Sequence, residues 1–310
     1  MNVLVTGATG YLGAEIVGRL LENAGRRVEA WGHTSANADA LRLRFSEHAD
    51  RLAVRTVDLL DPPDIASSID AVIHAAAVRP DGMPHARSEF DRLNVKGTQR
   101  VIDGALRAGC DRLLYVSSQS VYGTSGAPWA EDSPIDPRTA YAESKRRGEI
   151  RVLESNITCR GIVRLSRLYG VTPLTRWSEL PGRFAQAALR GEPLVIHGSG
   201  TQRVDLLHVR DAAEAIVMLV DADHLPESFA FNVGGGTSYS LNEFSEVFVR
   251  LALRYGLPAV RVVYQPERRP SGGSHFELCT GLIERTVGWR PRITLNDGVA
   301  EYLEALAAER

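Results

Sequence analysis

The sequence predicts an α/β protein in which a doubly wound parallel sheet is joined to a smaller C-terminal lobe. Apolar runs of strand length alternate with helical stretches through the first two thirds of the 310 residues, which is the βαβ rhythm of that fold class. The runs are almost continuously apolar, as expected of strands buried on both faces. After Gly170, shorter elements separated by prolines replace this rhythm, which indicates the second lobe.

Six apolar runs are the expected strands of the sheet: Asn2–Thr6, Arg27–Gly32, Leu52–Val57, Ala71–His74, Arg112–Ser117 and Thr158–Leu165. Two of the stretches between them carry clear helix signals. Gly13–Asn23 is expected to be a helix closed by Gly25, and Glu89–Ala108 a helix closed by Gly109. A glycine after the last turn takes the left-handed conformation at low cost and so ends a helix.

The chain is expected to return to the sheet after it has entered the second lobe. A helical pattern and a strand-like run within residues 204–233 read as further elements of the sheet domain. We therefore expect residues 1–170, with 204–233 returning, to form the first domain. Residues 171–203 and 234–310 would form the smaller lobe.

Charge and composition exclude several classes of partner. The 36 basic side chains nearly balance the 38 acidic ones, for a formal net charge of −2, so there is no positive excess for nucleic acid or an anionic membrane. No apolar run reaches the about 18–20 residues of a membrane span, and the N-terminus lacks a signal-peptide pattern. Three widely spaced cysteines without a CxxC pair fit a reducing compartment and predict no metal site. We expect a cytoplasmic protein.

A glycine-rich turn, TGATGYLG at Thr6–Gly13, follows the first strand and opens the first helix. Its glycines let the backbone approach an anion without Cβ atoms in the way, and the free amides of the helix start face that anion. In this context the motif predicts a dinucleotide with its pyrophosphate on the turn. Residues 1–170 would then be a dinucleotide-binding domain, and the lobe would bind substrate. The expected contacts in the turn are Gly7, Thr9, Gly10, Tyr11, Leu12 and Gly13.

The end of the second strand bears on which nicotinamide dinucleotide is bound. An NAD site places an acid about 20 residues after the glycines, where it accepts from the ribose hydroxyl. The segment Trp31–Ser35 has no carboxylate, and Glu29 comes too early. His33 and Ser35 could instead contact a 2′-phosphate. This favours NADP, with NAD as the alternative because the usual arginine is also missing.

Tyr141 and Lys145 are four residues apart in a predicted helix, so both lie on one face. The lysine ammonium is expected to lower the pKa of the phenol from about 10, and an oxidised nicotinamide would add to this effect. That would suit Tyr141 to general acid–base catalysis near neutral pH. Upstream, the hydroxyl-rich segment Tyr115–Gly123 ends a predicted strand at the edge where doubly wound sheets bind ligands.

Together these motifs resemble the extended short-chain dehydrogenase/reductase family, which contains sugar-nucleotide epimerases, dehydratases and reductases. The resemblance covers nearly the whole chain and implies a Rossmann-like fold, a nicotinamide dinucleotide and a sugar-like substrate. It rests on these segments in order: TGATGYLG from Thr6, VDLLD from Val57, HAAA from His74, NVKGT from Asn94, SSQSVYG from Ser117, YAESK from Tyr141, LYG from Leu168, HVRD from His208, FNVG from Phe231 and GWRP from Gly288.

The resemblance implies a role for each matching residue. Ser118 would polarise a substrate carbonyl or hold a hydroxyl, Tyr141 would donate or accept the proton, and Lys145 would bind the nicotinamide ribose. For Asn94 two roles stay open, support of the site through backbone contacts or a helix-packing amide. Further cofactor contacts are implied at Asp58, Leu59, Ala75, Ala76, Ala77 and Asn94. Substrate contacts are expected at Arg79, Ser118, Gln119, Ser120, Arg167, Arg203 and Arg269.

Two departures from the family pattern bear on the reaction and the substrate. Dehydratases of the family carry an acidic pair directly after the catalytic hydroxyl, where this chain has Gln119 and Ser120, so dehydration is disfavoured. The family arginine that holds a nucleotide diphosphate is replaced by Val204, with Arg203 one residue early and so on the opposite face of a strand. Two interpretations follow for the arginines Arg167, Arg203 and Arg269. They form a rearranged phosphate clamp, or the substrate is not a nucleotide sugar and these arginines are surface charges or ion-pair partners.

The expected function is an NADP-dependent ketoreductase that reduces a keto group of a nucleotide-linked deoxysugar or a related polyol carbonyl, with Tyr141 as proton donor. The alternative is a sugar-nucleotide epimerase that retains NAD. A non-catalytic dinucleotide sensor is disfavoured because both Tyr141 and Lys145 are present. By the same resemblance we expect a homodimer that packs the helices around Glu89–Arg107 and Tyr141–Glu154 across a two-fold axis.

Overall fold

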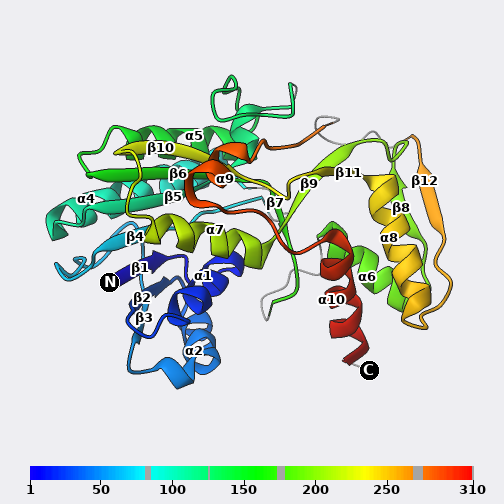
Figure 1. Cartoon of the computed structure of the whole chain (residues 1–310), viewed down its shortest axis with the longest axis horizontal. Helices are drawn as coiled ribbons and strands as arrows, with labels where there is room; N and C mark the ends of the chain where they lie inside the picture. Colours follow the sequence, from blue (N-terminus) through cyan, green and yellow to red (C-terminus); the bar gives the residue numbers. More distant parts are fainter. Residues whose placement is uncertain (81–84, 125, 173–178, 268–274, 309–310) are drawn as a thin grey trace.

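Seven parallel strands form the main sheet of the computed structural model, which describes residues 1–80, 85–124, 126–172, 179–267 and 275–308. They lie in the order β10-β6-β5-β4-β1-β2-β3 (Figure 1), which is a doubly wound order extended by one strand. The predicted fold class is confirmed. The strands are β1 Asn2–Thr6, β2 Arg27–Gly32, β3 Leu52–Thr56, β4 Ala71–His74, β5 Arg112–Ser118, β6 Cys159–Leu165 and β10 Ser228–Val233.

Helices cover both faces of this sheet. α1 and α7 pack against each other on one face, and α4 and α5 lie together on the other (Figure 1). Side chains of β1 alternate between two apolar clusters, with Val3 and Val5 on the α1 side and Leu4 on the α4 side. This two-sided burial explains the continuous apolar runs. The helices are α1 Tyr11–Leu21, α2 Ser35–Arg44, α3 Arg87–Phe90, α4 Thr98–Ala108, α5 Ala140–Leu153 and α7 Val209–Asp221.

The first helix differs from its predicted bounds, Gly13–Asn23. α1 begins two residues earlier, directly after Gly10, whose extended backbone forms the N-cap, and it ends two residues earlier. Gly25 does not close it. The Gly25 N–H instead donates to Asn23 Oδ1 at 3.0 Å, in a turn that follows the helix. A local side-chain hydrogen bond therefore ends the helix before the glycine is reached.

The predicted helix Glu89–Ala108 consists of three parts. α3 is followed by a π-helical segment, Asp91–Gly97 (η2), and then by α4. Gly109 closes α4 as expected, with a left-handed φ of 69°. π-Helical turns are wider than α-helical ones and are frequent at functional sites. This one carries Asn94.

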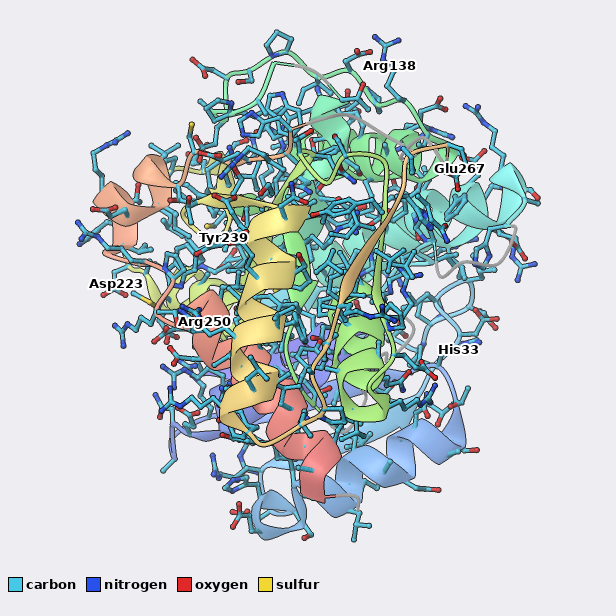
Figure 2. The ribbon with its side chains drawn as sticks, turned by 90° about the vertical axis from the view of Figure 1, so that its right-hand side faces the viewer. His33, Arg138, Asp223, Tyr239, Arg250 and Glu267 are labelled. Atoms are coloured by element: carbon cyan, nitrogen blue, oxygen red, sulfur yellow. The ribbon has the colours of Figure 1, made fainter. Side chains whose placement is uncertain are left out.

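The C-terminal lobe consists of short strands and the helices α6, α8 and α10, which pack around an apolar cluster that includes Phe184, Phe244 and Tyr302. Its strands form a β11-β9-β7 sheet and a β12-β8 pair. Figure 2 shows this lobe face-on, with Arg250 on α8. No helix in the described parts of the chain has the length and apolar character needed to cross a membrane. The elements are β7 Arg167–Tyr169, α6 Leu180–Arg190, β8 Leu194–His197, β9 Arg203–His208, β11 Ser238–Ser240, α8 Leu241–Arg254, β12 Val262–Gln265 and α10 Leu295–Ala308.

Some of the chain after residue 233 packs on the main sheet. α9 (Gly281–Val287) contacts β10, and Ile283 and Trp289 belong to the apolar cluster under α1 and α7. β9, in contrast, pairs with β7 and β11 of the lobe. The two regions are therefore interleaved along the chain. The division at the predicted residues stays a prediction.

One carbonyl joins the first loop of the chain to its last helix. The carbonyl oxygen of Gly170 accepts hydrogen bonds from the hydroxyls of Tyr11 at 2.7 Å and Tyr302 at 3.0 Å. Gly170 has φ of 128°, and a Cβ there would lie 2.5 Å from the His208 ring, so the position requires glycine. The glycine-rich turn, the end of β7 and α10 meet at this point.

Candidate active site

The glycine-rich turn has the close backbone contacts that a pyrophosphate site requires. Gly7 has φ of 68°, and a Cβ there would lie 2.7 Å from the backbone of Ala76. A Cβ on Gly13 would lie 2.1 Å from the carbonyl oxygen of Gly7. The turn is thus packed against the end of β4, and the N-terminus of α1 follows it directly. These residues fit a dinucleotide phosphate.

A buried histidine holds the end of β4 beside the turn. His74 Nδ1 lies 2.6 Å from Thr6 Oγ1, and Nε2 lies 2.9 Å from Thr98 Oγ1. Burial lowers the pKa of His74 to about 3, and the charge of Lys145 acts in the same direction. His74 is therefore neutral and serves as a fixed hydrogen-bonding link. It holds the segment Ala75–Ala77, which is expected to line the cofactor, next to the glycines.

The end of β2 leaves the expected 2′-phosphate contacts accessible. His33 and Ser35 are exposed, and Figure 2 places His33 at the edge of the molecule. Thr34 lies between them and caps α2 with its hydroxyl. Glu29 is directed elsewhere, because it accepts from Trp31 Nε1 at 2.7 Å. A carboxylate is therefore not positioned for a ribose at this strand end.

Asp58 and Leu59 follow β3, at the same carboxyl edge of the sheet. Asp58 is exposed, and its Oδ1 accepts from the N–H of Leu60 at 2.9 Å. This hydrogen bond holds the carboxylate in the loop. Contact with the adenine stays a prediction for both residues.

Ser118 and Tyr141 come together at the carboxyl edge of the sheet. Ser118 ends β5, and its Oγ accepts from the N–H of Ser120 at 3.2 Å. Tyr141 lies in the first turn of α5. Burial raises the pKa of its phenol, and a hydrogen bond with Ser118 and the charge of Arg79 lower it. The two expected catalytic hydroxyls therefore lie near each other at this edge.

Lys145 lies one helical turn after Tyr141 and is 2% exposed. Its Nζ lies 4.1 Å from the centroid of the Tyr115 ring. Burial lowers the pKa of Lys145 to about 7, and the charge of Glu149 opposes this. The expected lowering of the Tyr141 pKa below its usual value is wrong for the ligand-free chain, because burial disfavours the charged forms of both groups.

Asn94 links two segments of the site through backbone and side-chain contacts. Its amide accepts from the N–H of Val78 at 2.7 Å and donates to the carbonyl of Val78 at 2.9 Å. It also donates to Ser144 Oγ at 2.9 Å, and Ser144 donates to the carbonyl of Tyr141 at 2.7 Å. These contacts correspond to the supporting role. Direct contact with a cofactor stays a prediction.

Two buried polar atoms lie directly after Ser118. Gln119 Oε1 and Ser120 Oγ have no hydrogen-bond partner among the described residues. Both residues belong to the 3-10 turn Gln119–Tyr122 (η3) that follows Ser118. An unpaired buried polar group costs about 1–3 kcal/mol, so a polar ligand that supplied the missing hydrogen bonds would be stabilised here.

Arg79 connects the sheet domain to the lobe. Its Nη2 lies 2.7 Å from Oε1 of Glu179, the N-cap residue of α6. Its charge also lowers the pKa of Tyr141, so it lies within electrostatic reach of the catalytic phenol. The position suits a substrate contact, which stays a prediction.

The three expected arginines of the lobe differ in what the structure describes of them. Arg203 donates to Ser238 Oγ at 3.0 Å and pairs with Glu243 at 3.2 Å, so its guanidinium is engaged within the lobe. Arg167 is exposed at the start of β7. Arg269 lies outside the described residues. The ion-pair reading therefore holds for Arg203 in this structure, and substrate contacts stay predictions for all three.

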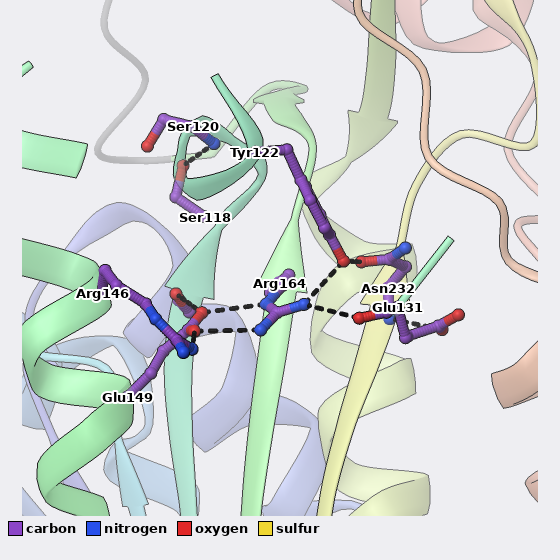
Figure 3. A network of polar contacts seen from close by, with 9 residues as sticks. Ser118, Ser120, Tyr122, Glu131, Arg146, Glu149, Arg164 and Asn232 are labelled. Atoms are coloured by element: carbon purple, nitrogen blue, oxygen red, sulfur yellow. Dashed lines mark hydrogen bonds and ion pairs between the residues drawn. The ribbon is translucent and has the colours of Figure 1, made fainter. Parts of the chain in front are cut away.

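Sequence reasoning missed a charged pair beneath the site. Glu149 and Arg164 are 0% and 3% exposed, and Arg164 contacts both carboxylate oxygens of Glu149 at 3.0 Å (Figure 3). Arg164 also donates to the hydroxyl of Tyr122 at 2.7 Å. The available signal was the position of Glu149, one helical turn after Lys145 and therefore on the same helix face.

Comparison with known proteins identifies the family. The profile of the NAD dependent epimerase/dehydratase family matches residues 3–234. The chain belongs to this family. The match runs from β1 through the glycine-rich turn and both catalytic segments to the end of β10, and the resemblance to extended short-chain dehydrogenase/reductases is confirmed.

Relatives in the epimerase/dehydratase family have several activities. A dTDP-glucose 4,6-dehydratase of Streptomyces niveus is 30% identical, with 98% of this chain and 92% of the relative covered. A UDP-glucose 4-epimerase of Mycolicibacterium smegmatis is 28% identical, with 98% of each chain covered. The solved structure of MoeE5 in complex with UDP-glucuronic acid and NAD is 27% identical and covers all of both chains, with a TM-score of 0.81. The chain is thus an enzyme of a family whose named members act on sugar nucleotides.

Proposed function

We propose that the chain is a sugar-nucleotide epimerase that oxidises and re-reduces one ring carbon with retained NAD. One observation carries the proposal. Ser118 lies near Tyr141 and is followed directly in the sequence by a neutral pair, Gln119 and Ser120. Hydride transfer needs the first two residues, whereas elimination of water needs a protonated acid and a deprotonated base near the position of the pair.

The residues divide the reaction between them. Bound NAD would supply the hydride acceptor and, for the return step, the hydride donor. The glycine-rich turn holds its phosphates and Lys145 its ribose. With oxidised dinucleotide bound, its positive charge and that of Lys145 would favour the phenolate of Tyr141. This phenolate would take the proton of the sugar hydroxyl as the carbon loses its hydride, and Ser118 would hydrogen-bond the oxygen that becomes a ketone. Tyr141 then returns the proton as the hydride returns to the opposite face, so that electrons and protons balance.

The neutral pair supports an epimerase over a dehydratase. Dehydration requires a base that removes the proton beside the ketone and an acid that protonates the departing hydroxyl. The amide of Gln119 and the hydroxyl of Ser120 neither gain nor lose a proton near neutral pH. Their unpartnered oxygens suit the hydroxyls of a sugar, which both donate and accept.

The test is to denature the purified protein, assay the released dinucleotide and incubate native protein with UDP-glucose or UDP-glucuronic acid. We expect stoichiometric NAD and formation of the epimer without added cofactor. In D₂O the epimer should carry no solvent deuterium on carbon, because the hydride stays within the site. Deuterium beside a ketone would identify a dehydratase and overturn the proposal.

An NADP-dependent ketoreductase is the second candidate. The end of β2 favours it, because exposed His33 and Ser35 stand where an NAD site has its carboxylate. Calorimetric titration with NAD and NADP separates the two candidates. A preference for NADP of about tenfold or more, equal to about 1.4 kcal/mol, together with turnover that consumes added NADPH, would support the ketoreductase.

A further inference from the structure

Glu149 is a buried carboxylate that hydride transfer does not itself use. It lies on α5 and is 0% exposed. Its oxygens accept from Ser117 Oγ at 2.6 Å and from Nε and Nη2 of Arg164 at 3.0 Å, and Oε2 pairs with Arg146 at 2.9 Å (Figure 3). A carboxylate offers about four lone-pair sites, so these contacts satisfy it.

These contacts hold the segment that carries Ser118 at both of its ends. Ser117, which Glu149 binds, directly precedes Ser118. At the other end Arg164 donates to the hydroxyl of Tyr122, the last residue of η3, and this hydroxyl donates to Asn232 Oδ1 at 2.8 Å. The strand end and the 3-10 turn are therefore fixed relative to α5, the helix of Tyr141 and Lys145.

Glu149 also supplies charge to the surroundings of Lys145. Among the described residues, the titratable groups that act on or lie against Lys145 are His74 from β4, Tyr115 from β5 and Glu149 from α5. Tyr141 lies one turn before Lys145 on α5. The pKa of His74 is lowered to about 3, and burial raises the pKa values of Tyr115 and Tyr141. All three are therefore neutral at pH 7. Among these groups Glu149 is the anion.

We propose that Glu149 is the positioning residue of the active site: it fixes the Ser118 segment to the catalytic helix and keeps Lys145 an ammonium ion at working pH. The inference rests on the proposed use of Ser118, Tyr141 and Lys145 in hydride transfer. A merely structural ion pair would stabilise the fold but would leave the titration of Lys145 unchanged.

The composition of the chain allows a direct test. Lys145 and the exposed Lys96 are its two lysines. Protein labelled with ¹³C at lysine Cε therefore gives two NMR signals, and the chemical shift of each, followed against pH, gives the titration midpoint of that lysine. In Glu149→Gln we expect the midpoint of Lys145 to fall by about one pH unit, since an opposite charge is lost. The midpoint of Lys96 should stay constant as the internal reference. An unchanged Lys145 midpoint in the folded variant overturns the proposal.

Glu149→Gln leaves Arg164 buried without its counter-charge and can unfold the chain. A second comparison avoids this problem. Arg164→Gln and the double variant Glu149→Gln/Arg164→Gln differ only in the charge at residue 149. The Lys145 midpoint should be about one pH unit lower in the double variant. Equal midpoints in the two variants contradict the proposal.

Turnover tests the positioning role. In Glu149→Gln we expect kcat to fall about tenfold or more, while KM for the sugar nucleotide stays within about threefold of wild type. The alkaline limb of the pH profile of kcat should move to lower pH, because it follows the titration midpoint of Lys145. Glu149→Asp, which keeps the charge, should keep the alkaline limb in place. The matched control is Glu143→Gln, which removes a carboxylate that pairs with Arg87 on the outer side of the same helix.

The two proposals fail separately. A wild-type chain that converts no sugar nucleotide would overturn the proposed function, while the lysine titration would still decide the role of Glu149. An alkaline limb that stays in place in Glu149→Gln, while kcat falls only in proportion to the folded fraction, overturns the positioning role.

Discussion

The charged pair beneath the candidate active site, Glu149 and Arg164, and the arginines of the lobe differ in how far their charges are exposed to solvent. Beneath Ser118, Glu149 and Arg164 are almost fully buried, and each is held by several partners. In the lobe, the side chain of Arg203 is 38% exposed and pairs with Glu243, whose side chain is 50% exposed. Arg167 is exposed as well.

The difference shows where the molecule can change. A buried ion pair that loses one partner costs about 3–5 kcal/mol of stability, so few substitutions of Glu149 or Arg164 are expected to be tolerated. An exposed pair contributes about 0–1 kcal/mol, so the lobe can exchange partners when a substrate binds. If the proposed roles hold, we expect substitutions in the buried pair to alter the chemistry and substitutions in the lobe to alter the range of substrates.

The largest effect is expected for Tyr141→Phe, which tests the proton-transfer role of the sheet domain. The ring keeps its edge contact with Phe90, whose centroid lies 6.0 Å away, while the proton carrier is lost. We expect kcat to fall by about 10²–10⁴-fold with dinucleotide affinity within about threefold, as measured by turnover and calorimetry. A kcat within tenfold of wild type would assign the proton transfer to another group.

Gly13→Ala tests the rigidity of the cofactor turn. The added Cβ would lie 2.1 Å from the carbonyl oxygen of Gly7, so the turn must shift. An overpacked site costs about 1–3 kcal/mol, and if the dinucleotide complex bears this cost, binding weakens about 5–150-fold in a calorimetric titration. Gly25→Ala, whose Cβ would meet only Asn23 at 3.4 Å, is the control and should bind as wild type does. Equal affinities in the two variants would contradict a rigid turn.

Arg203→Gln carries the smallest expected effect and probes the adaptable lobe. Its guanidinium is occupied by Ser238 and Glu243, so we expect KM for the sugar nucleotide to change by about threefold or less, since exposed pairs contribute little. Steady-state kinetics at two salt concentrations measures this. A tenfold rise in KM that salt abolishes would mean that Arg203 leaves its partners to bind phosphate. It would support the hypothesis of a rearranged phosphate clamp.

The sheet and the placement of Tyr141 and Lys145 on one helix could be predicted because their signals are local. β1, β2 and β4 were predicted with their observed bounds, since strands buried on both faces must be apolar throughout. The spacing of Tyr141 and Lys145 on a helix likewise needs no knowledge of other elements.

The contacts that escaped prediction depend on which strands lie side by side. Ser117 and Arg164 are register partners on β5 and β6, and this pairing brings both side chains to Glu149. Arg79 and Glu179 are 100 residues apart. The π-helical segment that directs Asn94 toward Val78 and Ser144 likewise has no local signal, because helix propensity does not distinguish its wider turns.

The shared carbonyl of Gly170 has a consequence for the order in which the protein matures. Chains emerge from the ribosome N-terminus first, so the turn that holds Tyr11 is synthesised long before residue 170. The carbonyl that Tyr11 and Tyr302 share gains its second donor only after α10 has been made. The glycine-rich turn therefore acquires its full set of contacts only when segments that are far apart in the sequence have come together.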